Sequence, residues 1–206
     1  MTDFMTITIE VSGRHVHLCQ KDLDTLFGKG HSLSVYHPIS QRGQFATVET
    51  VGVKIGKKVL KGVRIVGPVR DHSQVELSRS DALRLGIDTE VRLSGTIQGT
   101  PGATVLGPKG RIRLKEGVII PHRHIHASPA AAKKAGVRNG SIVSVRVAGI
   151  RAVTFHRVIV RMHPTYRWHM HIDTDEGNAA GIRQRATGIV IKPLSYGKEA
   201  HKHQVA

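Results

Sequence analysis

Three pairs of histidines, each pair separated by a single residue, are the groups in this sequence best suited to chemistry. The pairs are His15 with His17, His124 with His126, and His169 with His171. In a β-strand, residues i and i+2 point to the same face, so each pair would present two imidazoles side by side. Two imidazoles on one face can chelate a divalent metal ion. One such pair would be weak support for a metal centre, but three pairs in one chain predict one.

A repeated segment places these histidines, together with one glutamate, at equivalent positions. Each copy runs from a metal-capable residue, through a helix-capping residue two positions later, to a glycine ten positions later that precedes Ile or Val. The clear copies begin at Glu76, His126 and His171, and a looser copy, one residue longer, begins at His17. A purely structural repeat would explain the capping residues and the glycines. It would not explain a His or Glu at the start of every copy.

Each copy carries the signals of a strand, a helix of two turns and a second strand. Ser78, Ser128 and Asp173 can accept hydrogen bonds from the free N–H groups at a helix start. Pro129 stands at a first helical position, where its missing N–H costs nothing. The glycine that follows each helix can end it in a left-handed conformation. The repeat therefore predicts corners that each hold a metal-capable side chain at a strand end, beside a helix start.

The chemistry of the donors indicates which metal would bind. Imidazole nitrogens with one carboxylate favour zinc, and other first-row metals are also compatible with them. The chain has enough of these ligands for two ions. His122 lies on the same strand face as His124 and His126, so it competes with them as a ligand.

The rest of the chain alternates in short runs broken by glycine. Residues 51–66 around Gly56, and 104–114 around 107–110, have hairpin patterns, and no helical period exceeds about ten residues. The pattern predicts a mainly β protein built from barrels or sandwiches. A single cysteine, Cys19, excludes a disulfide scaffold, and we expect it to be a small buried filler. No apolar run could span a membrane and no secretory pattern opens the chain, so we predict a cytoplasmic location.

The charge is strongly basic and unevenly distributed. Lys and Arg number 31 and Asp and Glu 15, which gives +16 overall. The net charge is −1 over residues 1–50, +7 over 51–122 and +10 over 123–206. This bias predicts an anionic partner, either nucleic acid or a polyphosphate small molecule, unless it is only a solvated surface. Arg70, six residues before Glu76, offers a planar fork suited to phosphate, although an ordinary surface arginine is an equal alternative.

Several longer motifs occur in order between residues 7 and 192. They are Ser12–Leu18, Gly67–Arg70, Ser73–Ser78, Ser94-Gly95, Gly99–Gly102, Arg123–Ser128 and Met170–Gly181. Together these segments resemble the propanediol-utilisation-type phosphate acyltransferases, the phosphate propanoyltransferase family. The resemblance covers most of the chain.

For the fold, the resemblance implies two six-stranded β-barrel domains capped by short helices, one of them interrupted in sequence by the other. Mapped onto this chain, residues 1–50 and 122–192 would form the first barrel and residues 51–121 the second. Residues 193–206 would be a loose basic tail.

For the function, the resemblance implies reversible acyl transfer between coenzyme A and phosphate, with two zinc ions per chain. One ion would take His15, His17 and Glu76. The other would take His124, His126 and His171. Arg70 would be the catalytic residue that holds phosphate, and the coenzyme A pocket would be lined by Ser12, Arg64 and Asn178.

The resemblance also implies a homodimer acting on acyl-coenzyme A and phosphate, and neither a membrane nor a nucleic-acid partner is expected. The motifs begin too early for an N-terminal microcompartment-targeting extension, so we expect a free cytosolic enzyme. His37 stands where the family tends to have lysine, and His122 and His169 are additional histidines. Two alternatives stay open: a dinuclear zinc hydrolase of thioesters or phosphate esters, and a basic RNA-binding barrel protein with structural zinc.

Overall fold

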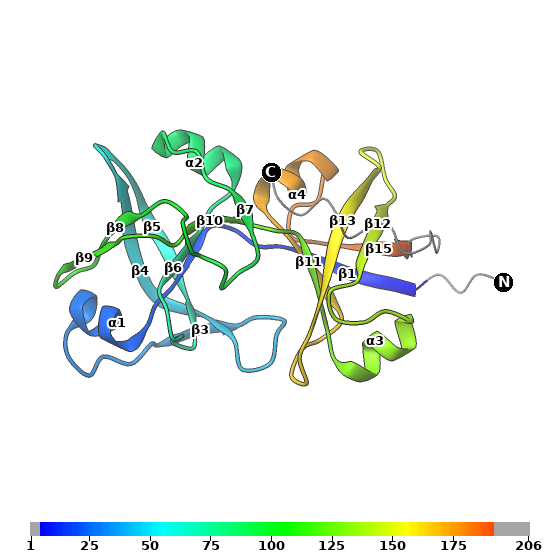
Figure 1. The fold of residues 1–206 in the computed structure, drawn as a ribbon, viewed down its shortest axis with the longest axis horizontal. Coiled ribbons are helices and arrows are strands. Elements are labelled where there is room, and N and C mark those ends of the chain that lie inside the picture. Colours follow the sequence, from blue (N-terminus) through cyan, green and yellow to red (C-terminus); the bar gives the residue numbers. More distant parts are fainter. Residues whose placement is uncertain (1–4, 192–206) are drawn as a thin grey trace.

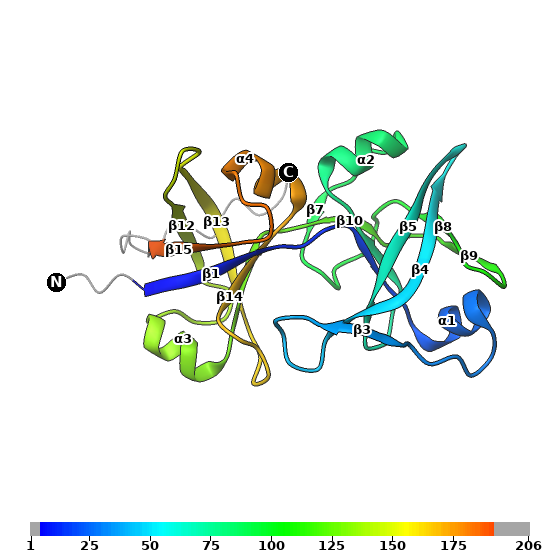
Figure 2. The ribbon, with the colours of Figure 1, turned by 180° about the vertical axis from the view of Figure 1, so that it is seen from behind.

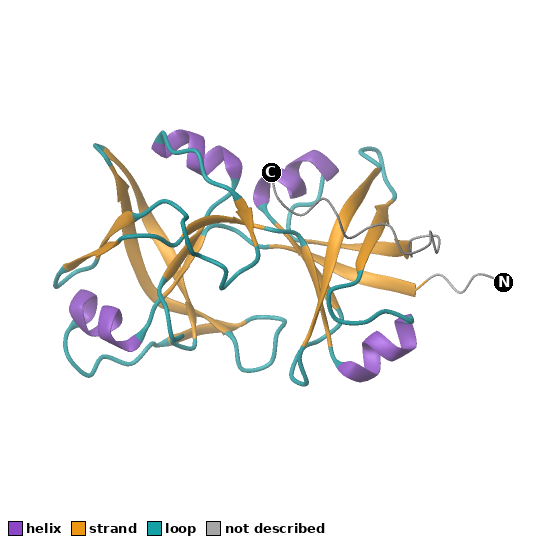
Figure 3. Ribbon diagram, viewed as in Figure 1, coloured by secondary structure: helices purple, strands orange, loops and turns teal. Residues whose placement is uncertain are grey.

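The computed structural model describes residues 5–191, so the predicted basic tail at 193–206 lies outside the described residues. The described part contains fifteen strands and four short helices, and it is mainly β, as predicted. The strands form two separate sheets that lie next to each other along the long axis of the molecule (Figures 1 and 3).

One sheet closes into the predicted six-stranded barrel. Its strands, in the order in which they pair, are β1 (Met5–Val11), β14 (His169–Ile172), β11 (His124–Ala127), β13 (Val153–Met162), β12 (Ile142–Val147) and β15 (Arg185–Ile191). The pairing of β15 with β1 completes the ring. The barrel therefore takes its first strand from the start of the chain and the other five from residues 124–191.

The second sheet has nine strands and stays open, so the prediction of a second six-stranded barrel is wrong. Its strands are β2 (His15–His17), β3 (Val35–Pro38), β4 (Phe45–Ile55), β5 (Lys58–Gly67), β6 (Gln74–Glu76), β7 (Val91–Arg92), β8 (Ala103–Leu106), β9 (Arg111–Leu114) and β10 (Val118–Pro121). The order is β7-β10-β6-β2-β5-β4-β8-β9, with β3 also paired to β4. The β8–β9 hairpin extends the sheet at β4, and the two-residue β7 is the opposite edge, so the edges do not meet.

The chain crosses between the sheets immediately after β1, as Figure 2 shows. The strands between residues 15 and 50 (β2, β3 and the first half of β4) pair in the open sheet, although the sequence analysis grouped residues 1–50 with the barrel. The chain returns to the barrel after β10, close to the predicted boundary at residue 122. The division into domains stays a prediction.

Four helices follow the strands of the repeat at α1 (Gln20–Phe27), α2 (Arg79–Leu85), α3 (Pro129–Ala135) and α4 (Thr174–Ala180). Ser78, Ser128 and Asp173 each accept a hydrogen bond from a backbone N–H in the first turn, as predicted. Cys19, at the start of α1, makes no such bond, which agrees with the looser first copy. Among the described helices, none is long and apolar enough to cross a membrane.

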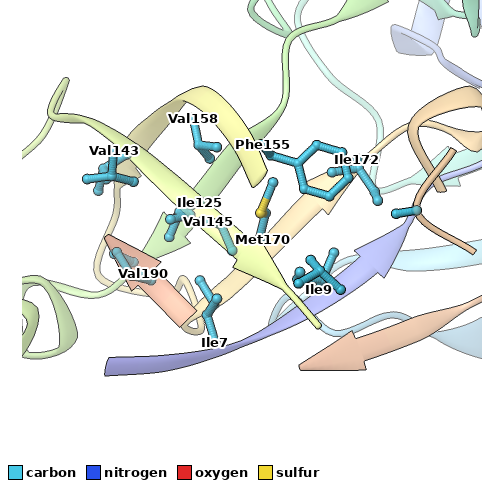
Figure 4. Close-up of a cluster of buried hydrophobic side chains, with 14 of the residues drawn as sticks. Ile7, Ile9, Ile125, Val143, Val145, Phe155, Val158, Met170, Ile172 and Val190 are labelled. Carbon is cyan, nitrogen blue, oxygen red and sulfur yellow. The ribbon is translucent and has the colours of Figure 1, made fainter. Parts of the chain in front are cut away.

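Apolar residues between the histidines fix the direction in which each ligand strand faces. Val16, Ile125 and Met170 are each fully buried, and each lies between the two histidines of a pair. Figure 4 shows Ile125 and Met170 pointing into the core of the barrel. Because successive side chains of a strand point to opposite faces of the sheet, the flanking histidines point away from these cores.

Candidate metal and anion site between the two sheets

A cavity of about 640 Å³ lies between the two sheets, and residues of both sheets line it. Nine of the ten residues predicted for the site line this cavity: Ser12, His15, His17, Arg64, Arg70, Glu76, His124, His126 and His171. The tenth, Asn178, is exposed on α4 and does not line the cavity. Of the additional histidines, His37 and His122 line the cavity and His169 does not.

His15, His17 and Glu76 form a buried cluster on β2 and β6, two neighbouring inner strands of the open sheet. Strand pairing sets His15 opposite Glu76, because β2 and β6 are antiparallel neighbours. The Nε2 atoms of the two histidines are 3.2 Å apart. The Glu76 carboxylate oxygens lie 3.3 Å from Nε2 of His15 and 3.7 Å from Nε2 of His17. In the described part of the chain, this is the one group whose metal-type donor atoms all lie within 4.8 Å of one another.

The hydrogen bonds of these histidines fix where their lone pairs point. Nδ1 of His15 lies 2.8 Å from the carbonyl oxygen of Gly13, and Nδ1 of His17 lies 2.9 Å from that of Val66. A carbonyl oxygen only accepts, so both Nδ1 atoms carry a hydrogen, and Nε2 is the atom of each ring that can offer a lone pair. Two lone pairs and a carboxylate thus face one another, an arrangement that a cation between them would stabilise.

Burial and the neighbouring groups together determine the charge states of His17 and Glu76. Burial, followed by the neighbouring His15, lowers the pKa of His17 to about 3, so its ring is neutral at pH 7. Burial opposes ionisation of Glu76, but His15 and His17 outweigh it and hold the pKa of this carboxyl at about 2. A neutral imidazole and an ionised carboxylate are the forms that bind zinc.

His124, His126 and His171 form a second cluster on the barrel. Antiparallel pairing of β11 with β14 sets His124 opposite His171. The ring centroids are 4.6 Å apart for His124 and His126, 4.9 Å for His126 and His171, and 5.4 Å for His124 and His171. Nδ1 of His126 is buried, and within the described residues it has no hydrogen-bond partner. An orphaned buried nitrogen beside two other imidazoles is the pattern that a metal ion would complete.

All three rings of the second cluster are neutral at pH 7. Burial lowers the pKa of His124 to about 4 and that of His171 to about 3, and it also strongly lowers the pKa of His126. The carboxylate of Glu76 raises the pKa of both His124 and His171, although burial outweighs this effect. The two clusters therefore lie within electrostatic reach of the same carboxylate.

Two arginines converge on Ser94, Arg70 from the segment that follows β5 and Arg161 from β13 of the barrel. Arg70 donates from Nη1 to the Ser94 hydroxyl at 3.0 Å, and Arg161 donates from Nη2 to the Ser94 carbonyl at 3.3 Å. Gln74 joins this group to the first cluster, because its amide donates to Ser94 at 2.7 Å and to Glu76 at 2.6 Å. Burial lowers the pKa of Arg70, which stays charged because an arginine begins near 12.5. Two guanidinium groups beside a metal-type cluster favour a bound oxyanion such as phosphate.

Four further residues line the cavity although no role could be predicted for them from the sequence: Ser94, Gln41, Arg161 and Tyr166. A signal existed for Arg161, because it ends an alternating run, and in the structure it lies opposite His126 across β13 and β11. Gln41 and Tyr166 lie in irregular segments, where no period marks them. The Gln41 amide is 3.4 Å from Nε2 of His171, and the ring of Tyr166 lies 3.9 Å from that of His126 between centroids.

Arg64, another predicted contact, also lines the cavity. Arg64 donates to the carbonyl of Thr47, and its guanidinium lies 4.8 Å from the ring centroid of Tyr36. His37, on the exposed strand β3, also reaches the cavity. A cationic group beside an aromatic ring, as Arg64 is beside Tyr36, suits an anionic ligand that carries a planar ring.

The fold and the site together define a class of protein: a two-sheet β protein whose shared cavity holds a group of metal-type donor atoms beside a pair of arginines. Comparison with known proteins narrows this class. The family model described as phosphate propanoyltransferase matches residues 8–183. Among the similar proteins are three named phosphate propanoyltransferase. One from Listeria monocytogenes is 43% identical over 186 residues, covering 90% of this chain and 87% of the relative.

One from Lachnoclostridium phytofermentans is 48% identical over 178 residues, covering 85% of this chain and 83% of the relative. One from Thermotoga maritima is 46% identical over 175 residues, covering 84% of this chain and 83% of the relative. The chain therefore belongs to the phosphate propanoyltransferase family and is an acyltransferase. The resemblance seen in the sequence motifs is confirmed.

Proposed function

We propose that this chain reversibly transfers a short acyl group, propanoyl or acetyl, from coenzyme A to inorganic phosphate, with two zinc ions per chain. The observation that best supports this proposal is the meeting of a buried His–His–Glu group and two arginines in one cavity, in a chain of this family.

The donor sets of both clusters fit zinc. His15, His17 and Glu76 would hold one ion, and their Nε2 atoms and ionised carboxylate already face one another. His124, His126 and His171 would hold the other ion. That ion would give His126, whose buried Nδ1 has no hydrogen-bond partner among the described residues, an interaction partner. When bound, zinc supplies Lewis-acid stabilisation of the negative charge that develops on the thioester oxygen or the departing sulfur.

Arg70 and Arg161 would bind and orient phosphate. Each guanidinium presents a fork of donors, and the two come from the segment after β5 and from β13, so they would hold phosphate oxygens from two sides. A phosphate oxygen then attacks the thioester carbonyl carbon, the carbon–sulfur bond breaks, and the sulfur leaves with a proton from phosphate. Holding both reactants in one cavity supplies much of the rate.

Ser12 and Arg64 would bind coenzyme A, since both line the cavity, as the exposed His37 also does. Asn178 does not line the cavity, so within one subunit it has no role in binding coenzyme A in this proposal. The phosphates of coenzyme A and the phosphate cosubstrate use part of the +16 charge. A homodimer and a cytoplasmic location stay predictions.

The experiment that tests this proposal measures thiol release from propanoyl- or acetyl-coenzyme A. Release that requires phosphate, stops after chelation and returns with zinc would support it. Release independent of phosphate would favour the thioester hydrolase. Affinity for RNA that falls steeply with salt, without any thiol release, would favour the RNA-binding alternative.

A further inference from the structure

Glu10 is a buried carboxylate at the cavity that the proposed function does not use. It lies on β1, between the two strands that flank β1 in the barrel. Register places it opposite His171 of β14 on one side and opposite Arg185 of β15 on the other. Its side chain is 12% exposed, and the residue lines the cavity. A buried carboxylate carries a large desolvation cost, so its surroundings must stabilise it.

The contacts of Glu10 leave its carboxylate short of donors. Oε1 lies 2.9 Å from Nη2 of Arg185, but it has no partner with hydrogen-bond geometry in the described part of the chain. Oε2 lies 4.0 Å from Nδ1 of His171. Nε2 of the same ring faces the Gln41 amide at 3.4 Å. His171 therefore has one nitrogen towards Gln41 and the other towards a carboxylate.

The other ligand histidines are held differently. Nδ1 of His15, His17 and His124 lies 2.8, 2.9 and 2.8 Å from the backbone carbonyls of Gly13, Val66 and His122. Those carbonyls orient the rings without adding a charge. Glu10 is the carboxylate placed behind the second cluster, whose three proposed ligands are all neutral. The first cluster has its own carboxylate, Glu76, in direct contact with its histidines.

We infer that Glu10 is a positioning residue for the second metal ion. Its carboxylate faces Nδ1 of His171 at 4.0 Å, and in the metal-bound protein it would accept the Nδ1–H, fix the orientation of the ring and add a negative charge that an all-histidine ligand set lacks. A carboxylate behind a metal-bound histidine fixes the ring and makes it a stronger donor, and losing one typically costs about 10- to 100-fold in metal affinity. The exposed Arg185 holds this carboxylate from the solvent side. The inference rests on the proposed second metal ion.

The test measures zinc affinity of the chelator-treated, folded protein with a competing chelator, so it does not depend on turnover. The His17→Ala background removes a ligand from the first cluster, so the remaining ion reports on the second. In that background Glu10→Gln should weaken zinc binding about 10- to 100-fold. In a His124→Ala background, where the first cluster remains, the same change should leave zinc affinity unaltered. The cobalt spectrum of the second site should shift only in the first of these backgrounds.

Glu49→Gln is the matched control, because Glu49 is another buried carboxylate paired with a histidine, His31, at 3.0 Å, and it lies outside the cavity lining. It should not change zinc affinity. Glu10→Asp keeps the charge and should retain more affinity than Glu10→Gln, which also covers a Gln variant that folds poorly. Equal affinity of Glu10→Gln and its parent, or equal loss in the Asp and Gln variants, would overturn the inference.

A parent protein that binds no second ion would also overturn it. A protein that binds two ions but shows no phosphate-dependent thiol release would overturn the proposed function and leave the role of Glu10 in metal binding intact. The two failures are thus distinguishable.

Discussion

Replacing Arg161 with alanine should weaken phosphate binding selectively. Arg161 reaches Ser94 from the barrel while Arg70 reaches it from the segment that follows β5, so the change removes one of two guanidinium groups. Its charge acts on the cavity, because Arg161 contributes to lowering the pKa of His124, His126 and Arg70. A hydrogen bond to a charged partner is worth about 1.5–3 kcal/mol. At about 1.4 kcal/mol per tenfold, kcat/KM for phosphate should fall roughly 10- to 150-fold.

The assay is initial-rate thiol release with phosphate varied at saturating propanoyl-coenzyme A, then the reverse. The effect should fall on the phosphate series, and KM for the acyl-coenzyme A should change little. Arg161→Lys keeps a point charge without the planar fork, so its kcat/KM for phosphate should lie between those of wild type and Arg161→Ala. Arg146→Ala, on an exposed position of β12, is the matched control and should behave like wild type. An unchanged phosphate dependence in Arg161→Ala, or an equal loss for both substrates, would refute the reasoning.

Three further changes test other parts of the structure. His126→Ala should abolish thiol release while circular dichroism stays native; full activity would exclude its role as a ligand. The metal-free protein should lose stability as the pH falls below about 6.5, because His17 is protonated there in the unfolded chain but stays neutral in the folded protein, where its pKa is about 3. This one group should lower the free energy of unfolding by about 2 kcal/mol at pH 5, which urea unfolding would measure. Ser78→Ala removes the cap of α2 and should cost about 1 kcal/mol of unfolding free energy, whereas Ser80→Ala, whose backbone N–H rather than side chain is bonded, should cost less.

The corners of the fold could be predicted because their physics is local. The caps at Ser78, Ser128 and Asp173 depend on residues three positions away, and all three form as expected. The facing of each histidine pair follows from strand alternation and from one apolar residue between the two imidazoles. These short-range rules place the side chains of both clusters on the correct faces.

The closure of the sheets could not be predicted in the same way, because strand partners are chosen over long distances in sequence. The β8–β9 hairpin was visible as an alternating run, but nothing in that run says that it pairs with β4 and widens the sheet. Arg161 shows the same limit at the site, since its closeness to His126 and Ser94 appears only once β13 pairs with β11.

The internal repeat explains why the cavity lies where the two sheets meet. Two copies of the corner, at His17 and Glu76, belong to the open sheet, and two, at His126 and His171, belong to the barrel. Each sheet can therefore assemble one ligand cluster by itself, but the paired arginines need both sheets. A bond from the Ser80 amide on α2 to the Asp175 carboxylate on α4, at 2.7 Å, ties the helices that follow Glu76 and His171. The two histidine clusters are thus properties of each half, whereas the proposed anion site depends on how the halves are held together.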